Sequence, residues 1–144
     1  MNEDRPWLSA DAVVFDMHDR LLLIRRKNDP FKGQHAFPGG FVENGETTEA
    51  AVLRELKEET GITAEEPQLI GVYSKPGRDP RHHTVTIAYL FFVRSAQPVA
   101  GDDAAAAEFR KDWADLTLAF DHGDILKDAI ALRARLPATL GKHG

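Results

Sequence analysis

Apolar residues occur along this chain in short runs separated by polar turns, a pattern typical of a protein rich in β-strands. Leu8 to Phe15 and Leu21 to Arg26 flank a turn-like Asp-Met-His-Asp sequence, and together they predict a β-hairpin. Further strands are predicted at residues 41–43, 68–74, 84–94 and 108–116. Stretches rich in glycine, proline or charge predict loops at residues 27–38, 77–83 and 95–105.

Two segments have the apolar spacing of amphipathic helices. The first begins at Thr47 or Thr48, whose hydroxyl can cap it, and ends at Thr60 before Gly61, which suits a left-handed cap. The second is capped by Asp121 and ends before Pro137. This order of strands and helices predicts a single domain over residues 1–144, folded as an α/β/α sandwich around a central mixed sheet.

Composition narrows the class of protein. The 144 residues are 42% hydrophobic, enough for one core, and the net charge of −5 argues against a nucleic-acid binder. The absence of cysteine excludes disulfides and thiolate metal sites. A polar N-terminus and apolar runs too short to cross a bilayer predict a cytoplasmic protein without a membrane partner.

The most informative chemical feature is a group of acids on the first predicted helix. Glu55, Glu58 and Glu59 are spaced by three and four residues, so their carboxylates can converge beside the core. Like charges at these spacings cost a helix roughly 0.2–0.5 kcal/mol per pair, and the last helical turn disfavours anions. A solvated acidic face is the simplest interpretation, but a bound cation reverses both penalties. Oxygen ligands favour Mg²⁺ or Mn²⁺.

The segment before this helix supports a ligand site. Gly39 and Gly40 let the backbone approach a ligand closely, and the Gly39 carbonyl can join the same metal. Glu46 can brace the loop or pair with Arg54. The sequence therefore combines close-approach glycines with carboxylates, as a metal-phosphate site requires.

These residues follow one continuous pattern. Gly40 is followed after five residues by Glu46, and after seven more by the sequence Arg-Glu-Leu-Lys-Glu-Glu-Thr-Gly-Ile of residues 54–62. This pattern resembles a complete Nudix box over residues 40–62, with every defining position filled. The resemblance implies the Nudix fold and a hydrolase that cleaves the diphosphate of a nucleoside diphosphate linked to another group.

The resemblance also implies residue roles. Metal ligands are expected at Gly39, Glu55, Glu58 and Glu59. Arg54 resembles the family arginine that orients the glutamates, and Glu46 resembles its partner. Metals would neutralise the diphosphate and activate water, and Glu58 or Glu55 would take the proton.

In parts of that family an acid from a later loop binds metal or acts as the base. Asp102, Asp103 and Glu108 are the candidates, with Asp103 as the expected metal ligand. An ordinary surface acid is an equally good interpretation of each of them.

Residues outside the box are similar to ADP-ribose pyrophosphatases, in the stretches 25–31, 37–43 and 75–81. Arg78 and Arg81 can clamp phosphate or ribose oxygens, Arg26 can reach the base or the diphosphate, and Phe31 can stack on adenine. Surface charges and a loop anchor are the alternative interpretations. Residues 35, 37 and 82–83 depart from that subgroup's common pattern, which affects the pocket.

The expected reaction is therefore hydrolysis of ADP-ribose to AMP and ribose 5-phosphate, with a small molecule as partner and a homodimer as the expected assembly. One alternative is a nucleotide-pool cleaner acting on oxidised or non-standard nucleoside triphosphates. A second is a non-catalytic ADP-ribose-sensing module, as in some transcription regulators. A third is a dinucleoside polyphosphate or RNA-cap hydrolase, and the missing basic patch counts against the cap version.

Overall fold

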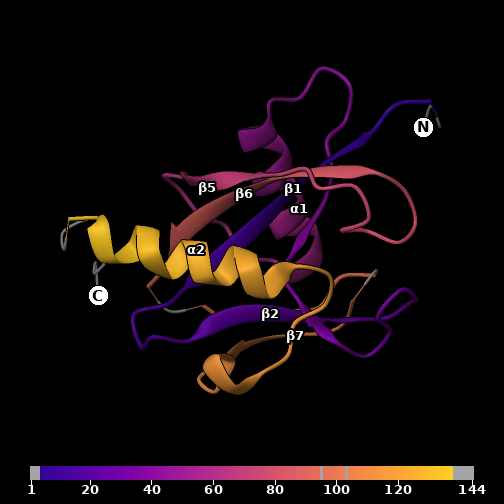
Figure 1. Ribbon diagram of the computed structural model, residues 1–144. Coiled ribbons are helices and arrows are strands. Elements are labelled where there is room, and N and C mark those ends of the chain that lie inside the picture. Colours follow the sequence, from indigo (N-terminus) through magenta and orange to yellow (C-terminus); the bar gives the residue numbers. More distant parts are fainter. Residues whose placement is uncertain (1–3, 95, 103, 138–144) are drawn as a thin grey trace.

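The computed structural model describes residues 4–94, 96–102 and 104–137, and a mixed sheet of seven strands forms its centre (Figure 1). The strands are β1 (Trp7–Phe15), β2 (Leu21–Arg26), β3 (His35–Ala36), β4 (Gly39–Phe41), β5 (Gln68–Tyr73), β6 (Thr84–Phe92) and β7 (Ala104–Arg110). The helices are α1 (Thr48–Thr60) and α2 (His122–Arg135), with a short 3₁₀ turn at Trp113–Asp115.

The central strand β1 divides one of its edges between two partners. Its other edge pairs in parallel with β6 along its whole length. On the divided edge, β2 pairs with it only at Phe15, beside the turn, whereas β4 pairs with residues 9–11. The predicted hairpin is therefore right at the turn and wrong beyond it, because β2 leaves β1 to pair with β3 and β7. This divergence opens a fork in the sheet.

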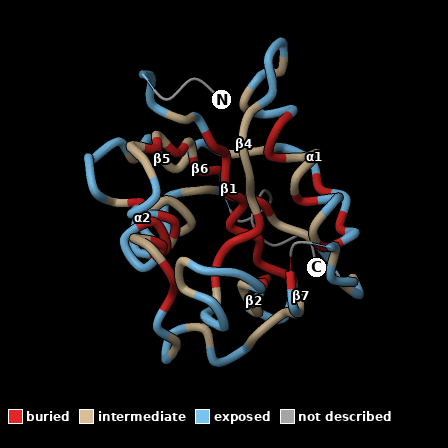
Figure 2. The backbone as a smooth tube through the Cα atoms, turned by 90° about the vertical axis from the view of Figure 1, so that its right-hand side faces the viewer, coloured by how far each residue is buried: buried red, intermediate tan, exposed pale blue. Residues whose placement is uncertain are grey.

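Each face of the sheet carries its own core and its own helix. Ala12 and Val14 of β1 pack with Leu56 of α1, whereas Val13 and Phe15 pack with Ile125 of α2. Successive side chains of a strand point to opposite faces, so one strand serves both cores. Figure 2 shows the helices on either side of β1, and the predicted α/β/α sandwich is confirmed.

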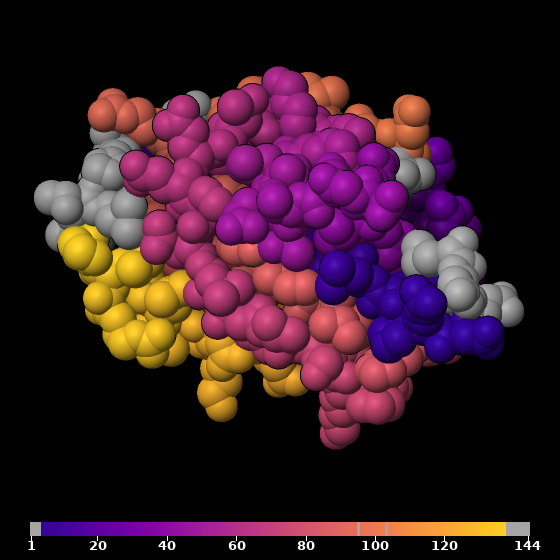
Figure 3. Space-filling view, turned by 90° about the horizontal axis from the view of Figure 1, so that it is seen from above, coloured from indigo at the N-terminus to yellow at the C-terminus, as the bar shows by residue number. Residues whose placement is uncertain are grey.

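Helix α1 has the predicted ends. The Thr47 hydroxyl accepts from the Ala50 N–H at 3.0 Å, and Gly61 has the left-handed φ of 73° and donates to the Lys57 carbonyl. The loop after β6 covers the C-terminal end, because Gly101 donates to the Glu59 carbonyl at 2.8 Å. Seen from above, the α1 segment covers the centre of the surface, with α2 at its edge (Figure 3).

Several predicted boundaries were wrong. Strand β7 occupies 104–110 rather than 108–116, since alanines with weak strand preference pair with β2, and residues 113–115 form a 3₁₀ turn instead. Strand β4 lies at 39–41 rather than 41–43, and β3 falls within a predicted loop. Asp121 precedes α2 without capping it, because its carboxylate binds Arg78. In the described part of the chain, every helix is too short or too polar to span a membrane.

Candidate functional site

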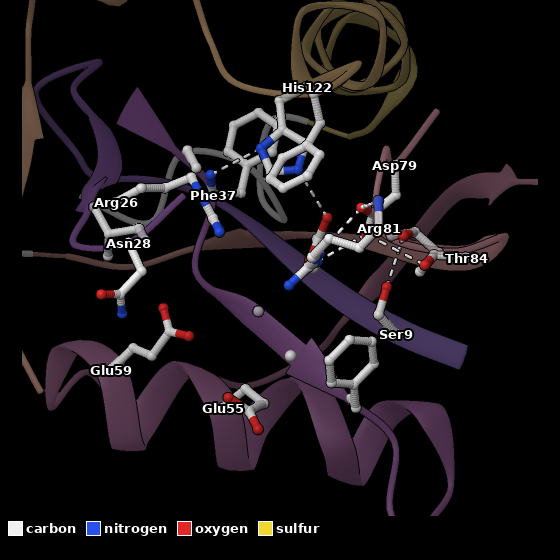
Figure 4. Close-up of a pocket in the computed structure, with 18 of the residues that line it drawn as sticks. Ser9, Arg26, Asn28, Phe37, Glu55, Glu59, Asp79, Arg81, Thr84 and His122 are labelled. Carbon is white, nitrogen blue, oxygen red and sulfur yellow. Dashed lines mark hydrogen bonds and ion pairs between the residues drawn. The ribbon is translucent and has the colours of Figure 1, made fainter. Parts of the chain in front are cut away.

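A cavity of about 340 Å³ opens at the fork in the sheet. The diverging strands β1 and β2, with β3 and β4 between them, form its floor and sides. Figure 4 shows α1 on one side of the cavity and the start of α2 on the other. The cavity therefore exists because β2 separates from β1 after a single paired position.

One wall of the cavity consists of acidic side chains of α1 and the backbone of β4. Glu55 and Glu59 project from α1 toward the cavity (Figure 4). Gly39 and Gly40 of β4 also line it. A Cβ atom on Gly40 would lie 2.4 Å from the Glu55 carboxylate carbon. The missing side chain of Gly40 thus leaves room for the Glu55 carboxylate against β4.

The Gly39 carbonyl faces the same side as the helix. Pro38 accepts from β1 and Val42 donates to β1, and ladder bonds alternate along a strand, so the carbonyls of Gly39 and Phe41 point away from β1. The Phe41 carbonyl accepts from Arg54 Nη2 at 3.1 Å. The Gly39 carbonyl therefore lies on the edge of β4 that faces the acidic helix.

Arg54 joins the acids into a network. Its guanidinium binds Glu46 through two hydrogen bonds, of 2.7 and 2.9 Å, and donates to Glu55 at 2.7 Å and to Glu58 at 3.2 Å. The bonds from Arg54 lower the pKa of Glu46 from 4.5 to about 2. The hydrogen bonds with Glu46 in turn raise the pKa of Arg54. The structure therefore brings together the predicted Arg54, Glu46, Glu55 and Glu58.

The three predicted metal-binding glutamates do not all point into the cavity. Glu58 lies outside its lining, with a side chain 59% exposed and held by Arg54. Across the residues that the structure covers, no three acidic or histidine side chains gather closely enough to hold a metal. The donor chemistry nevertheless fits a hard divalent cation, because carboxylates of Glu55 and Glu59 and the Gly39 carbonyl border one cavity.

The opposite wall carries two arginines beside one aromatic ring. The guanidinium carbons of Arg26 and Arg81 lie 4.8 and 5.6 Å from the ring centroid of Phe120. Burial and the nearby charge of Arg81 lower the pKa of Arg26. Asp79 binds Arg81 at 2.7 Å. A bound anion would offset the repulsion that Arg81 exerts on the Arg26 cation.

Two predicted substrate residues have other contacts. Arg78 borders the cavity, but its side chain is only 5% exposed and binds Asp121 through two hydrogen bonds of 2.7 and 2.8 Å. Phe31 lies outside the cavity lining and packs on Phe120, with ring centroids 4.7 Å apart. Phe120 lines the cavity, as do Phe37 and Phe41, whereas Phe31 does not.

Two of the three candidate later acids, Asp102 and Glu108, are not part of the cavity lining. Glu108 pairs with Arg110 at 2.8 Å on β7. Asp102 is exposed, and its backbone carbonyl accepts from Lys27. Asp103 lies outside the described residues.

The sequence analysis missed several residues of the cavity, including Asp11 and His122. A signal existed for β1, because Ser9 and Asp11 share a face with Val13 and Phe15 and so put polar groups where core residues belong. His122 carried no such signal, since its contacts with Phe37 and Asp11 depend on the fold.

The glycine strand, the acidic helix linked by Arg54 and the cavity all lie within one segment that matches a known domain family. The model of the NUDIX domain matches residues 5–134. The chain belongs to the Nudix family. The match includes residues 40–62, the segment that resembles a Nudix box, and the cavity lies where this segment meets β1 and α2.

Relatives narrow the kind of Nudix protein. The ADP-ribose pyrophosphatase of Methanocaldococcus jannaschii is 51% identical over 124 residues, which are 85% of this chain and 72% of that protein. The ADPR responsive transcriptional repressor NtrR of Acinetobacter baylyi is 32% identical over 88% of this chain, but the match spans only 54% of the repressor. These matches establish a Nudix pyrophosphohydrolase.

A solved structure matches the fold closely. The NUDIX domain of Shewanella oneidensis NrtR, in complex with ADP ribose, superposes with a TM-score of 0.83 at 29% identity. The match covers 89% of this chain and 88% of that domain. The Nudix fold of this chain is therefore shared by the NUDIX domain of NrtR.

Proposed function

We propose that this Nudix protein hydrolyses ADP-ribose to AMP and ribose 5-phosphate, with a divalent cation held by its acidic wall. The observation that carries the proposal is a single cavity with Glu55 and Glu59 on one side and Arg26 and Arg81 on the other. A diphosphate needs both kinds of wall, a metal held by carboxylates and guanidinium donors for its remaining oxygens.

The relatives support ADP-ribose as the substrate. The relative that is 51% identical is named an ADP-ribose pyrophosphatase, and the structurally similar NUDIX domain is a complex with ADP ribose. The second candidate function, sensing without catalysis, is favoured by the 32% identity to a repressor that responds to the same molecule. The acidic residues of the box favour catalysis.

The metal would be Mg²⁺ or Mn²⁺, bound by Glu55, Glu59 and the Gly39 carbonyl. Glu58 would complete the set of metal ligands. Its side chain is exposed and tied to Arg54 by one bond of 3.2 Å, and breaking that bond to reach the metal costs little. When bound, such a metal lowers the pKa of water and neutralises phosphate charge.

The chain's own residues would then hold the substrate and move one proton. Arg26 and Arg81 bind the diphosphate oxygens, and Phe120 stacks against a ring of the nucleotide. Glu58 or Glu55 accepts the proton of the attacking water. Water adds to phosphorus, the bridging P–O bond breaks, and the leaving phosphate departs with its sugar. Arg54, braced by Glu46, keeps the glutamates in position.

A substrate panel tests the proposal. The protein is incubated with Mg²⁺ and either ADP-ribose, other nucleotide sugars, dinucleoside polyphosphates or oxidised and standard nucleoside triphosphates, and the products are identified by chromatography. We expect AMP from ADP-ribose, with the highest kcat/KM of the panel. Preference for triphosphates would identify a pool cleaner instead. Tight ADP-ribose binding without turnover would identify a sensor.

Removal of one acid tests the metal site. We expect Glu59→Gln to lower kcat by more than the roughly 10–100-fold typical of residues that only support metal ligands, with little change in thermal unfolding. EDTA should abolish activity, and Mg²⁺ or Mn²⁺ should restore it. Glu65→Gln, an exposed acid beyond the helix, is the matched control and should keep full activity. Full turnover by Glu59→Gln, or activity in EDTA, would refute the metal site.

A further inference from the structure

A buried histidine and a buried aspartate meet on the wall of the cavity opposite α1. His122 is 6% exposed and Asp11 7% exposed, and both border the cavity. Asp11 comes from β1. His122 comes from the first turn of α2, as Figure 4 shows. The reaction proposed above assigns neither residue a role.

The hydrogen bonds of His122 determine where its proton lies. The backbone N–H of Phe37 donates to His122 Nδ1 at 3.1 Å, so this nitrogen presents a lone pair. A neutral ring then carries its proton on Nε2, which lies 3.2 Å from Asp11 Oδ2. Nε2 of His122 and its proton therefore face the Asp11 carboxylate.

Aromatic rings hold the imidazole in this orientation. The ring of Phe37 stacks on it with centroids 4.9 Å apart and planes 18° apart, and Phe120 packs against it at 5.5 Å. A turn of the ring about its axis would break the bond from Phe37 and would move Nε2 away from Asp11. The pair is consequently rigid.

The carboxylate of Asp11 is fixed on its second side by backbone. A Cβ atom on Gly39 would lie 2.1 Å from Asp11 Oδ1, so this oxygen lies directly against the glycine strand. A carboxylate only accepts hydrogen bonds, and its two oxygens offer more positions than the one that His122 occupies. Asp11 thus presents a rigid acceptor at the cavity wall.

We propose that Asp11 is a specificity-determining residue that accepts a hydrogen bond from a sugar hydroxyl of the substrate, and that His122 is the positioning residue that holds it. The inference rests on the proposed function. Hydroxyls donate to a carboxylate, whereas another phosphate is repelled by it. The hydroxyls of Ser9 and Thr86, joined at 2.6 Å on the same wall, extend the polar surface beside it. This wall therefore selects a nucleotide sugar over a nucleoside triphosphate.

Kinetics of Asp11→Asn test the contact. We expect kcat/KM for ADP-ribose to fall roughly 10- to 100-fold, mostly through KM, because a hydrogen bond to a charged group has about that effect. Asp115→Asn, an exposed residue of the 3₁₀ turn, is the matched control and should behave as wild type.

Substrate analogues identify the hydroxyl. Two sets of ADP-ribose analogues are used, one lacking hydroxyls on the adenosine ribose and one on the terminal ribose. The set that lacks the bound hydroxyl should be a poor substrate for wild type, and Asp11→Asn should lower its kcat/KM no further. For the other set, Asp11→Asn should lower kcat/KM as much as it does for ADP-ribose. Equal loss of ADP-ribose and both sets in Asp11→Asn would overturn the contact.

The positioning role of His122 has its own measurement. His122→Gln retains a donor toward Asp11 and should keep most of the affinity for ADP-ribose, whereas His122→Phe should raise KM as Asp11→Asn does. In ¹⁵N NMR spectra the wild-type ring should show its proton on Nε2, and Asp11→Asn should shift that resonance. A proton on Nδ1, or equal KM values for the Gln and Phe variants, would overturn the role.

Failure of this inference differs from failure of the proposed function. Wild-type KM in Asp11→Asn, in a protein that hydrolyses ADP-ribose, overturns the inference alone. A wild-type protein that rejects nucleotide sugars and cleaves triphosphates overturns both. If Asp11→Asn fails to fold, wild-type protein still decides, because unchanged KM for both sets of analogues overturns the inference.

Discussion

Individual side chains in and beside this cavity have their charge and orientation set by one or two neighbours. Glu46 illustrates this, because two bonds from Arg54 and the backbone N–H of Glu43 all stabilise its ionised form. Gly40 illustrates the steric counterpart, since the missing side chain makes room for Glu55. Each feature leads to a prediction about that residue.

Glu46 makes stability depend on pH in the acid range. Its pKa is lowered from 4.5 to about 2 in the folded protein, so the folded state binds the proton less readily than the unfolded state. The stabilisation is therefore fully present above about pH 4.5 and is lost as the pH falls through about 2. Thermal unfolding is followed between pH 6 and pH 2, with about one scan per half pH unit. The melting temperature of Glu46→Gln should fall less over this range than that of the wild type. Parallel curves for the two proteins would contradict the shift.

Gly40→Ala should separate activity from stability. The new Cβ would lie 2.4 Å from the Glu55 carboxylate carbon, and the flexible end of Glu55 can move away. A catalytic group misplaced by about 1 Å can cost roughly 100-fold in rate, so we expect a loss of that order. The melting temperature should change little. Gly123→Ala, where a Cβ meets open space, is the control. Normal kcat in Gly40→Ala would show that Glu55 tolerates displacement.

Among the secondary-structure elements, helix α1 depends on its surroundings at both ends. Thr47 caps its start, and the loop after β6 closes its end through the N–H groups of Val99 and Gly101. These bonds satisfy carbonyls that a helix leaves without intrahelical partners. The end of α1 that carries Glu58 and Glu59 is therefore held by a segment distant in sequence.

Gly101→Ala should loosen that end. A Cβ on Gly101 would lie 2.2 Å from the Glu58 carbonyl oxygen, and backbone cannot yield as a side chain does. We expect a loss of about 1–3 kcal/mol in the free energy of unfolding, as for other overpacked sites, with reduced kcat. Chemical denaturation and initial rates measure both. Gly71→Ala, whose Cβ would keep at least 3.5 Å from Tyr73, should be tolerated. Equal stability of the two variants would refute the closure.

At the level of the complete fold, one buried ion pair joins separate parts of the chain. Arg78, from the loop between β5 and β6, binds Asp121 at the start of α2 and the hydroxyl of Thr86 on β6. The loop, the sheet and the second helix thus meet at one guanidinium. This contact positions the wall that carries His122 and Phe120.

Arg78→Ala should therefore act on stability first. Removing one partner of a buried pair costs roughly 3–5 kcal/mol, and the 22% exposure of the Asp121 side chain favours the lower end. Arg110→Ala, which removes exposed ion pairs on β7, should cost only about 0–1 kcal/mol. Denaturant titrations compare the two. If Arg78→Ala unfolds like wild type but raises KM for ADP-ribose, Arg78 is a substrate clamp rather than a structural residue.

The acidic helix could be predicted from the order of residues alone because its determinants are local. Thr47, Gly61 and the spacing of the glutamates act within a few residues of one another, and the pair of Arg54 with Glu46 spans one turn and one loop. Helix capping and side-chain spacing depend on short-range geometry. These features specified the helix, its ends and the chemistry of one cavity wall.

The opposite wall was decided by tertiary structure. Strand β2 leaves β1 after one pair because β3 takes that edge of β2, while β7 pairs along its other edge, and no local preference of the alanines at 104–107 indicates the pairing with β7. Arg78 binds Asp121, and Asp11 binds His122, only because β1, the β5–β6 loop and α2 meet at the fork. Long-range strand pairing and burial select such partners, and a linear pattern of residue types does not encode which distant side chains will meet.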